Sequence, residues 1–270
     1  MLIGAMNHPM RDPLKEIEAF SRLGFEFVDL TLEPALARSD RVDATAIRGA
    51  LRDRSLRVVG HTAYYLPIAS PFVGLRQAAL DEMCRCLDVF VEVGAKLVNV
   101  HPDFRIPLHD EDYIVSANVE AIGTLVEMAR ERGLRMMVEN VPGTFNRKSV
   151  LRKLFRTYAD LGFHLDVGHA NLGVDGISTA ELLRACGERL VHVHLSDNRG
   201  GLDDLHLPLG AGRIDWRQVA TQLVGAGYDG TVTLEVFSPD QDYLVLSRAK
   251  WRRLWDEAVA ARPSAGHPLS

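Results

Sequence analysis

Short apolar runs alternate with longer segments of helical spacing along the chain, and this alternation is typical of α/β proteins. The runs are rich in Val, Leu and Ile, so we interpret them as buried strands. Eight strands are expected, at Leu2–Met6, Phe25–Leu32, Leu56–His61, Lys96–His101, Leu134–Glu139, Gly162–Asp166, Leu190–Leu195 and Thr231–Glu235. Eight such strands, each followed by a helix, close most economically into a barrel. The pattern therefore predicts a single-domain (β/α)8 TIM barrel.

Helical spacing fills the segments between these strands. The expected helices cover residues 12–23, 43–54, 74–93, 113–132, 148–160, 178–187, 215–226 and 242–260. Polar residues predict their starts and glycines predict their ends: Asp12, Ser178 and Asp215 are candidate N-caps, and Gly94, Gly133 and Gly227 are candidate stops. An open doubly wound sheet is the alternative fold. An open sheet of this kind is expected to have a glycine-rich loop after its first strand. Residues 7–10 contain no glycine, which disfavours it.

Domain boundaries follow from the same pattern. The barrel is expected to span residues 1–261, because no linker or low-complexity stretch interrupts it. Residues 262–270 contain two prolines and a glycine and are predicted to form a flexible tail.

Composition and charge narrow the function classes. The 270 residues are 47% hydrophobic and 25% charged, which is ordinary for a globular protein. The formal net charge of −5 gives no global attraction to nucleic acid or anionic lipid. Cys84 and Cys86 lie two apart on an expected helix and cannot bridge, so a reducing compartment fits best. No signal or membrane segment is visible, and we expect a cytoplasmic protein.

The last residue of each apolar run is a candidate functional residue, because the carboxyl ends of barrel strands meet at the face that holds the active site. Six consecutive strands end in residues of metal-ligand type: His61, His101, Glu139, Asp166, His194 and Glu235. The loops that follow add His169, Asp204 and His206. Imidazoles mixed with carboxylates suit Zn, Mn, Co or Fe rather than Mg or Ca. The sequence therefore predicts a divalent metal centre.

The nine side chains of metal-ligand type form the ligand ring. Residues nearer the amino ends of the strands are expected to support this ring. Period-two alternation places His164 below Asp166 and His192 below His194, as hydrogen-bonded inner residues rather than ligands. By contrast, Glu26 and Asp29 are expected on solvated faces or at the rim.

These motifs resemble the xylose isomerase-like TIM-barrel superfamily over roughly residues 2–260. The resemblance is carried by His61-Thr62-Ala63-Tyr64, Val100-His101-Pro102, Val138-Glu139-Asn140, Asp166-Val167-Gly168-His169, His192–Arg199, Asp204–Gly212 and Leu234-Glu235. The superfamily includes sugar isomerases and epimerases and also the endonuclease IV nucleases. In the first branch the resemblance implies one metal held by Glu139, Asp166, His194 and Glu235. In the second it implies three zinc ions, with His61, His101, His169, Asp204 and His206 as further ligands.

The favoured hypothesis is a metal-dependent isomerase or epimerase of a small sugar, polyol or sugar phosphate. The resemblance implies that Glu139 and Glu235 are both metal ligands and the acid/base pair. His169 and Arg199 would stabilise developing charge. Candidates for an apolar wall are Tyr64, Trp216 and Phe237.

The alternative hypothesis is an endonuclease IV-type zinc phosphodiesterase that acts at abasic sites in DNA. Short loops and an acidic chain argue against it, and nucleic acid is an expected partner only in this case. A metal-bearing barrel that binds a ligand without turning it over is a third hypothesis. Pairing into a homo-oligomer is left open by the sequence.

Overall fold

The computed structural model describes residues 1–104, 106–173 and 178–262, and eight parallel strands within them close into a barrel. The strands pair in chain order, and the first pairs with the last. They are β1 (Leu2–Met6), β2 (Phe27–Leu32), β3 (Arg57–Thr62), β4 (Leu97–Val100), β5 (Arg135–Glu139), β6 (Gly162–Asp166), β7 (Leu190–Leu195) and β8 (Thr231–Leu234). The predicted TIM barrel is confirmed, and the closed ring excludes the open sheet.

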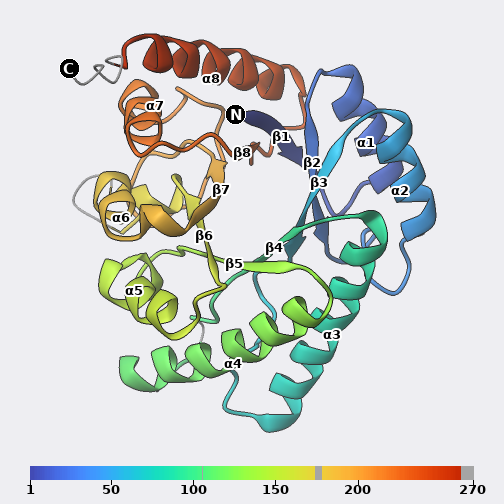
Figure 1. Ribbon diagram of the computed structural model, residues 1–270, viewed down its shortest axis with the longest axis vertical. Helices are drawn as coiled ribbons and strands as arrows, with labels where there is room; N and C mark the ends of the chain where they lie inside the picture. The colour runs from blue at the N-terminus through green and yellow to red at the C-terminus, as the bar shows by residue number, and fades with distance from the viewer. Residues whose placement is uncertain (105, 174–177, 263–270) are drawn as a thin grey trace, which may run out of the picture.

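Helices surround the strands, which occupy the centre of the molecule (Figure 1). They are α1 (Pro13–Arg22), α2 (Ala44–Asp53), α3 (Val73–Val93), α4 (Glu111–Glu131), α5 (Lys148–Thr157), α6 (Thr179–Cys186), α7 (Trp216–Gly225) and α8 (Asp242–Ala260). Within the described residues, three single turns of 3₁₀ helix lie in the loops: η1 (Thr144–Asn146), η2 (His169–Asn171) and η3 (Gly187–Arg189). None of the helices in the described part of the chain is long and apolar enough to span a membrane.

Most of the predicted helix boundaries carry the expected chemistry. The carboxylates of Asp12 and Asp215 accept hydrogen bonds from backbone N–H groups in the first turns of α1 and α7. Gly94 ends α3 with a left-handed φ of 89°. Ser178 precedes α6 as predicted, but its hydroxyl donates to the carbonyl of Ala170 instead of capping the helix. Of the predicted tail, 262–270, all but Arg262 lies outside the described residues.

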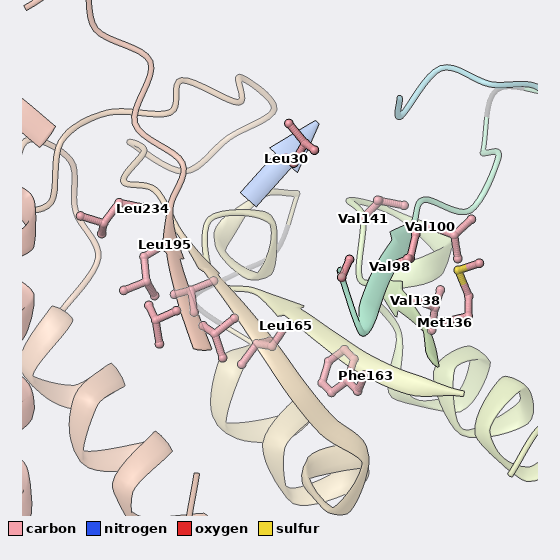
Figure 2. Close-up of a cluster of buried hydrophobic side chains, with 14 of the residues drawn as sticks. Leu30, Val98, Val100, Met136, Val138, Val141, Phe163, Leu165, Leu195 and Leu234 are labelled. Atoms are coloured by element: carbon pink, nitrogen blue, oxygen red, sulfur yellow. The ribbon is translucent and has the colours of Figure 1, made fainter. Parts of the chain in front are cut away.

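The outward faces of the strands form an apolar layer against the helices. Because successive strand residues point to opposite sides, every second residue belongs to this layer. Figure 2 shows the cluster where several strands meet, with Leu30, Val98, Val100, Met136, Val138, Phe163, Leu165, Leu195 and Leu234 among its members. Each large side chain buried here stabilises the fold by about 1.5–3 kcal/mol. This layer packs the barrel against its helices.

The inward faces change from apolar to polar along the strands. Phe27, Val59 and Met137 form a separate small apolar cluster inside the barrel. Two residues further along the same strands lie Asp29, His61 and Glu139, which are all buried. The period-two alternation therefore places titratable side chains on top of this apolar cluster, which fills the barrel at the amino ends of the strands and is called the apolar plug.

Replacing Gly4 by alanine is expected to destabilise the barrel at this plug. A Cβ added at Gly4 would lie 2.5 Å from ring carbons of Phe27, so the buried ring would have to move. Overpacking of this kind costs about 1–3 kcal/mol, which urea unfolding measures. Gly49→Ala in α2 is the matched control, because an added Cβ there meets no atom within 4 Å. Equal stability of the two variants would contradict the expectation.

Candidate metal centre

A cavity of about 570 Å³ opens at the carboxyl ends of the strands, and its floor is made of imidazoles and carboxylates. The polar residues that line it are His8, Thr31, Glu33, His61, His101, Glu139, His169, Asp204, His206 and Glu235. Apolar side chains, including Tyr64, Phe104, Leu202 and Phe237, form its walls. The size falls within the range of about 300–1,000 Å³ typical of small-molecule sites.

The first group of potential ligands comes from β3, β4 and β5. His101 Nε2 lies 3.0 Å from Glu139 Oε2, and His61 Nε2 lies 3.9 Å from the same oxygen. All three side chains are buried. Asn99 supports the group from below, since its amide donates to Glu139 Oε2 at 2.7 Å. One cation could therefore contact His61, His101 and Glu139 together.

The second group comes from β6, β7 and the residue after β8. Asp166 pairs in register with His194, which brings their side chains to the same level. His194 Nδ1 lies 3.1 Å from Glu235 Oε2 and 3.9 Å from Asp166 Oδ2. Glu139 also approaches Asp166, so the first two groups are contiguous.

The third group is built on loops. Asp204 Oδ2 lies 3.1 Å from both His169 Nε2 and His206 Nε2. The turn η2 carries His169 directly after β6, and the loop after β7 carries the other two. His206 has a left-handed φ of 44°, an uncommon conformation for a non-glycine residue that aims its ring back toward the cavity.

Hydrogen bonds around Asp166 leave one of its oxygens available. The backbone N–H of His169 donates to Asp166 Oδ1 at 2.6 Å, and Asn140 binds the backbone N–H and carbonyl of Asp166. Asp166 Oδ2 and His61 Nε2 are buried without a hydrogen-bond partner among the described residues. Unpaired buried polar atoms are costly, and here they face other ligand atoms. The donor set thus fits a divalent cation.

The electrostatics of the ring point the same way. Burial raises the pKa of Asp166 to about 7, with the charges of Glu139 and Glu235 adding to the effect. Burial also opposes ionisation of Glu139, yet His101 and His164 hold the pKa of this carboxyl well below its ordinary value. The carboxylates therefore repel one another and depend on positive neighbours. A dication at the centre would relieve this repulsion.

The structure brings nine of the ten predicted site residues together and leaves one apart. Arg199 is exposed and is not among the residues that line the cavity. Its neighbour Asn198 turns inward instead and donates to the carbonyl of Gly168, while Gly200 and Gly201 follow with left-handed φ values. Of the predicted apolar wall, Tyr64 and Phe237 line the cavity. Trp216 does not, because it packs in the core and donates to Asp197.

The expectation for Asp29 is wrong, because this residue is fully buried inside the barrel. Its Oδ2 contacts the Nε2 atoms of His192 and His194 at 3.1 Å and 2.7 Å. The signal was present in the sequence, since Phe27, Asp29 and Thr31 alternate on one face. His164 and His192 lie in the inner layer as predicted. Their group with His194 also resembles a ligand set, but Asp29 already contacts two of its three rings.

Replacing Asp197 by alanine is expected to destabilise the protein by removing the hydrogen bonds that hold the loop of the third group. Asp197 is buried, and its carboxylate accepts from the backbone N–H groups of Gly210 and Ile214 and from Trp216 Nε1. Leaving such donors unpaired costs about 1–3 kcal/mol each, so a loss of about 3 kcal/mol in urea unfolding is expected. Asp203→Ala on the same loop, where the side chain is exposed, should change little. Similar losses in both variants would refute this role.

Sequence comparisons match the chain to one family. The family described as xylose isomerase-like TIM barrel matches residues 17–261. Protein MJ1311 of Methanocaldococcus jannaschii is 32% identical over 207 residues, which cover 68% of this chain and 66% of that protein. A Haloarcula marismortui protein named "Probable endonuclease 4" is 27% identical over 173 residues, or 57% of this chain and 60% of that one. The first of these matches spans slightly less than two thirds of its relative.

Solved structures share the architecture over nearly the whole chain. A D-tagatose 3-epimerase-like protein superposes with a TM-score of 0.82 at 22% identity, covering 96% of this chain and 98% of the other. The TTHB071 protein of Thermus thermophilus, soaked with ZnCl2, superposes with a TM-score of 0.75 at 24% identity, covering 95% and 99%. At these identities the likeness establishes a common fold.

Proposed function

Because the chain belongs to the xylose isomerase-like TIM barrel family, we propose that it is a divalent-metal-dependent isomerase or epimerase. Its substrate would be a small sugar, polyol or sugar phosphate. The observation that carries the proposal is the convergence of Asp166, His194 and Glu235, with Glu139 beside Asp166. Glu139 and Glu235 of this set also line a cavity of small-molecule size. These four positions are the ones that the family resemblance assigns to a single metal in the sugar-converting branch.

A bound dication would polarise a substrate carbonyl and make the neighbouring C–H more acidic. The protein itself supplies the groups that move the proton. Glu139 and Glu235 come from β5 and from the end of β8, so they reach the cavity from different sides of the ring. One carboxylate would accept the proton from carbon, and the other, in its protonated form, would donate its own proton to carbon.

Other side chains would hold the substrate and its charge. His169 lies 3.0 Å from Glu139 and 3.1 Å from Asp204, and although burial opposes its charged form, the neighbouring carboxylates keep its pKa well above the ordinary value. A protonated imidazole at this position would stabilise negative charge on a substrate oxygen. Tyr64 and Phe237 would provide the apolar wall. The exposed side chain of Arg199 is not used in this mechanism.

Product analysis across a panel of ketoses, aldoses and inososes tests the proposal. Protein loaded separately with Mn, Co, Fe and Zn should interconvert at least one pair, and Glu139→Gln should abolish that conversion. Glu131→Gln at the exposed end of α4 makes the same chemical change away from the cavity and should leave it intact. No conversion by any metal-loaded form would remove the proposal.

A second candidate is a zinc phosphodiesterase that acts at abasic sites in DNA. The observation that favours it is the third group, in which Asp204 bridges His169 and His206 beyond the four residues that one metal needs. Three zinc ions per chain by elemental analysis, together with incision of an abasic duplex, would establish this candidate. One ion per chain without incision would exclude it.

A further inference from the structure

One carboxylate lies inside the barrel directly beneath the candidate metal centre. Asp29 Oδ2 accepts three hydrogen bonds, from His194 Nε2 at 2.7 Å, Thr233 Oγ1 at 2.7 Å and His192 Nε2 at 3.1 Å. All four residues are fully buried. His192 is held in turn by Thr231 Oγ1, 2.7 Å from its Nδ1. A buried ionised carboxylate needs such donors, and here they share a single oxygen.

This network decides which nitrogen of His194 faces the centre. An ionised carboxylate can only accept hydrogen bonds, so the Nε2 atom of His194 must carry the hydrogen. The opposite nitrogen, Nδ1, lies 3.1 Å from Glu235 Oε2 and 3.9 Å from Asp166 Oδ2, so it is the nitrogen that a cation between these groups would contact in place of a hydrogen. The imidazole therefore presents Nδ1, and not Nε2, to the second ligand group.

We propose that Asp29 is a positioning residue for the metal centre: it accepts the Nε2 hydrogen of His194 and thereby commits Nδ1 to the cation. Thr233 and His192 keep the carboxylate in place for this purpose. The inference rests on the metal-binding part of the proposed function, and not on the reaction or the substrate. A carboxylate behind a ligating histidine fixes the tautomer and ring orientation and strengthens the ligand.

Metal affinity measured by competition with a chromophoric chelator tests the proposal without any turnover. Asp29→Asn keeps the shape of the side chain but removes its charge, and the affinity for Zn or Co should fall about 10–100-fold. Thr233→Val is the matched control, because it removes one donor to the same oxygen and leaves the contact with His194. A purely structural role for Asp29 predicts similar affinity losses in both variants and would overturn the proposal.

A second measurement uses the wild-type protein and holds even where Asp29→Asn does not fold. Two-bond ¹H–¹⁵N correlation spectra of the zinc-loaded, ¹⁵N-histidine-labelled protein report which ring nitrogen binds metal. The His194 ring should show a metal-bound Nδ1 and a protonated Nε2. A metal-bound Nε2, as expected if a cation lay among His164, His192 and His194, would overturn the proposal. Because neither readout involves a substrate, absence of isomerase activity leaves both results interpretable.

Discussion

Glu139→Gln is expected to abolish turnover and to weaken metal binding at the same time. Glu139 belongs to the first group with His61 and His101, and it also lies close enough to Asp166 and His169 to share a cation with them. The amide has the same size as the carboxylate but carries no charge and cannot take a proton. Loss of the proton transfer alone costs about 10²–10⁴ in rate, and weaker metal binding adds to this loss.

Steady-state kinetics with saturating metal separate the two effects of this substitution. If metal is restored to full occupancy and the rate remains at least about 100-fold down, Glu139 acts in proton transfer as well as in binding. Glu131→Gln is the control, since it is exposed on α4. A variant at Glu139 that retains wild-type rate and metal content would show that the centre lies elsewhere.

Removal of the metal is expected to have the second largest effect. Four carboxylates are buried in or directly under the ring: Asp29, Glu139, Asp166 and Glu235. Burial, together with repulsion from Glu139 and Glu235, raises the pKa of Asp166 to about 7 when no cation is bound. A ligand that binds only the folded state stabilises it by about 4 kcal/mol at 1,000 times its Kd, or roughly 8–16 °C in Tm for a domain of this size.

Thermal unfolding before and after chelation measures the fall in Tm that removal of the metal causes. Activity should disappear with the metal and return on reconstitution with Mn, Co, Fe or Zn. Asp166→Asn removes one negative charge and one potential ligand from the centre. It therefore tests whether the effect of chelation on Tm depends on these residues. In that variant chelation should lower Tm much less than in the wild type. An equal Tm for metal-loaded and metal-free wild type would contradict a metal centre among these residues.

Strand periodicity made most of the barrel and of the ring predictable. His164 and Asp166 alternate with Phe163 and Leu165, so the inward and outward faces of β6 could be assigned from the residues alone. The same logic applied to β2 would have placed Asp29 inside the barrel. A lone acidic residue on a strand favours a surface position, but in this barrel His192, His194 and Thr233 supply the hydrogen-bond donors that a buried carboxylate needs.

Loop residues were predictable only by type and not by position. Asp204 and His206 join the ring because Asp197 fastens their loop, through hydrogen bonds to residues that lie more than ten positions away. Arg199 follows the same strand, but Asn198 takes the inward position and leaves the arginine exposed. Such outcomes depend on which loop donors find partners, and spacing along the chain does not encode this.

If the ring holds a divalent metal that serves proton transfer next to a carbonyl, the protein should exchange substrate hydrogen with solvent. Incorporation of solvent deuterium into carbon-bound positions of a sugar panel measures this, because exchange reports C–H cleavage even where no net product accumulates. We expect exchange by the metal-loaded wild type, none by the chelated protein, and a loss of at least about 100-fold with Glu139→Gln. Full metal occupancy without exchange into any member of the panel would contradict a proton-transfer role for the ring.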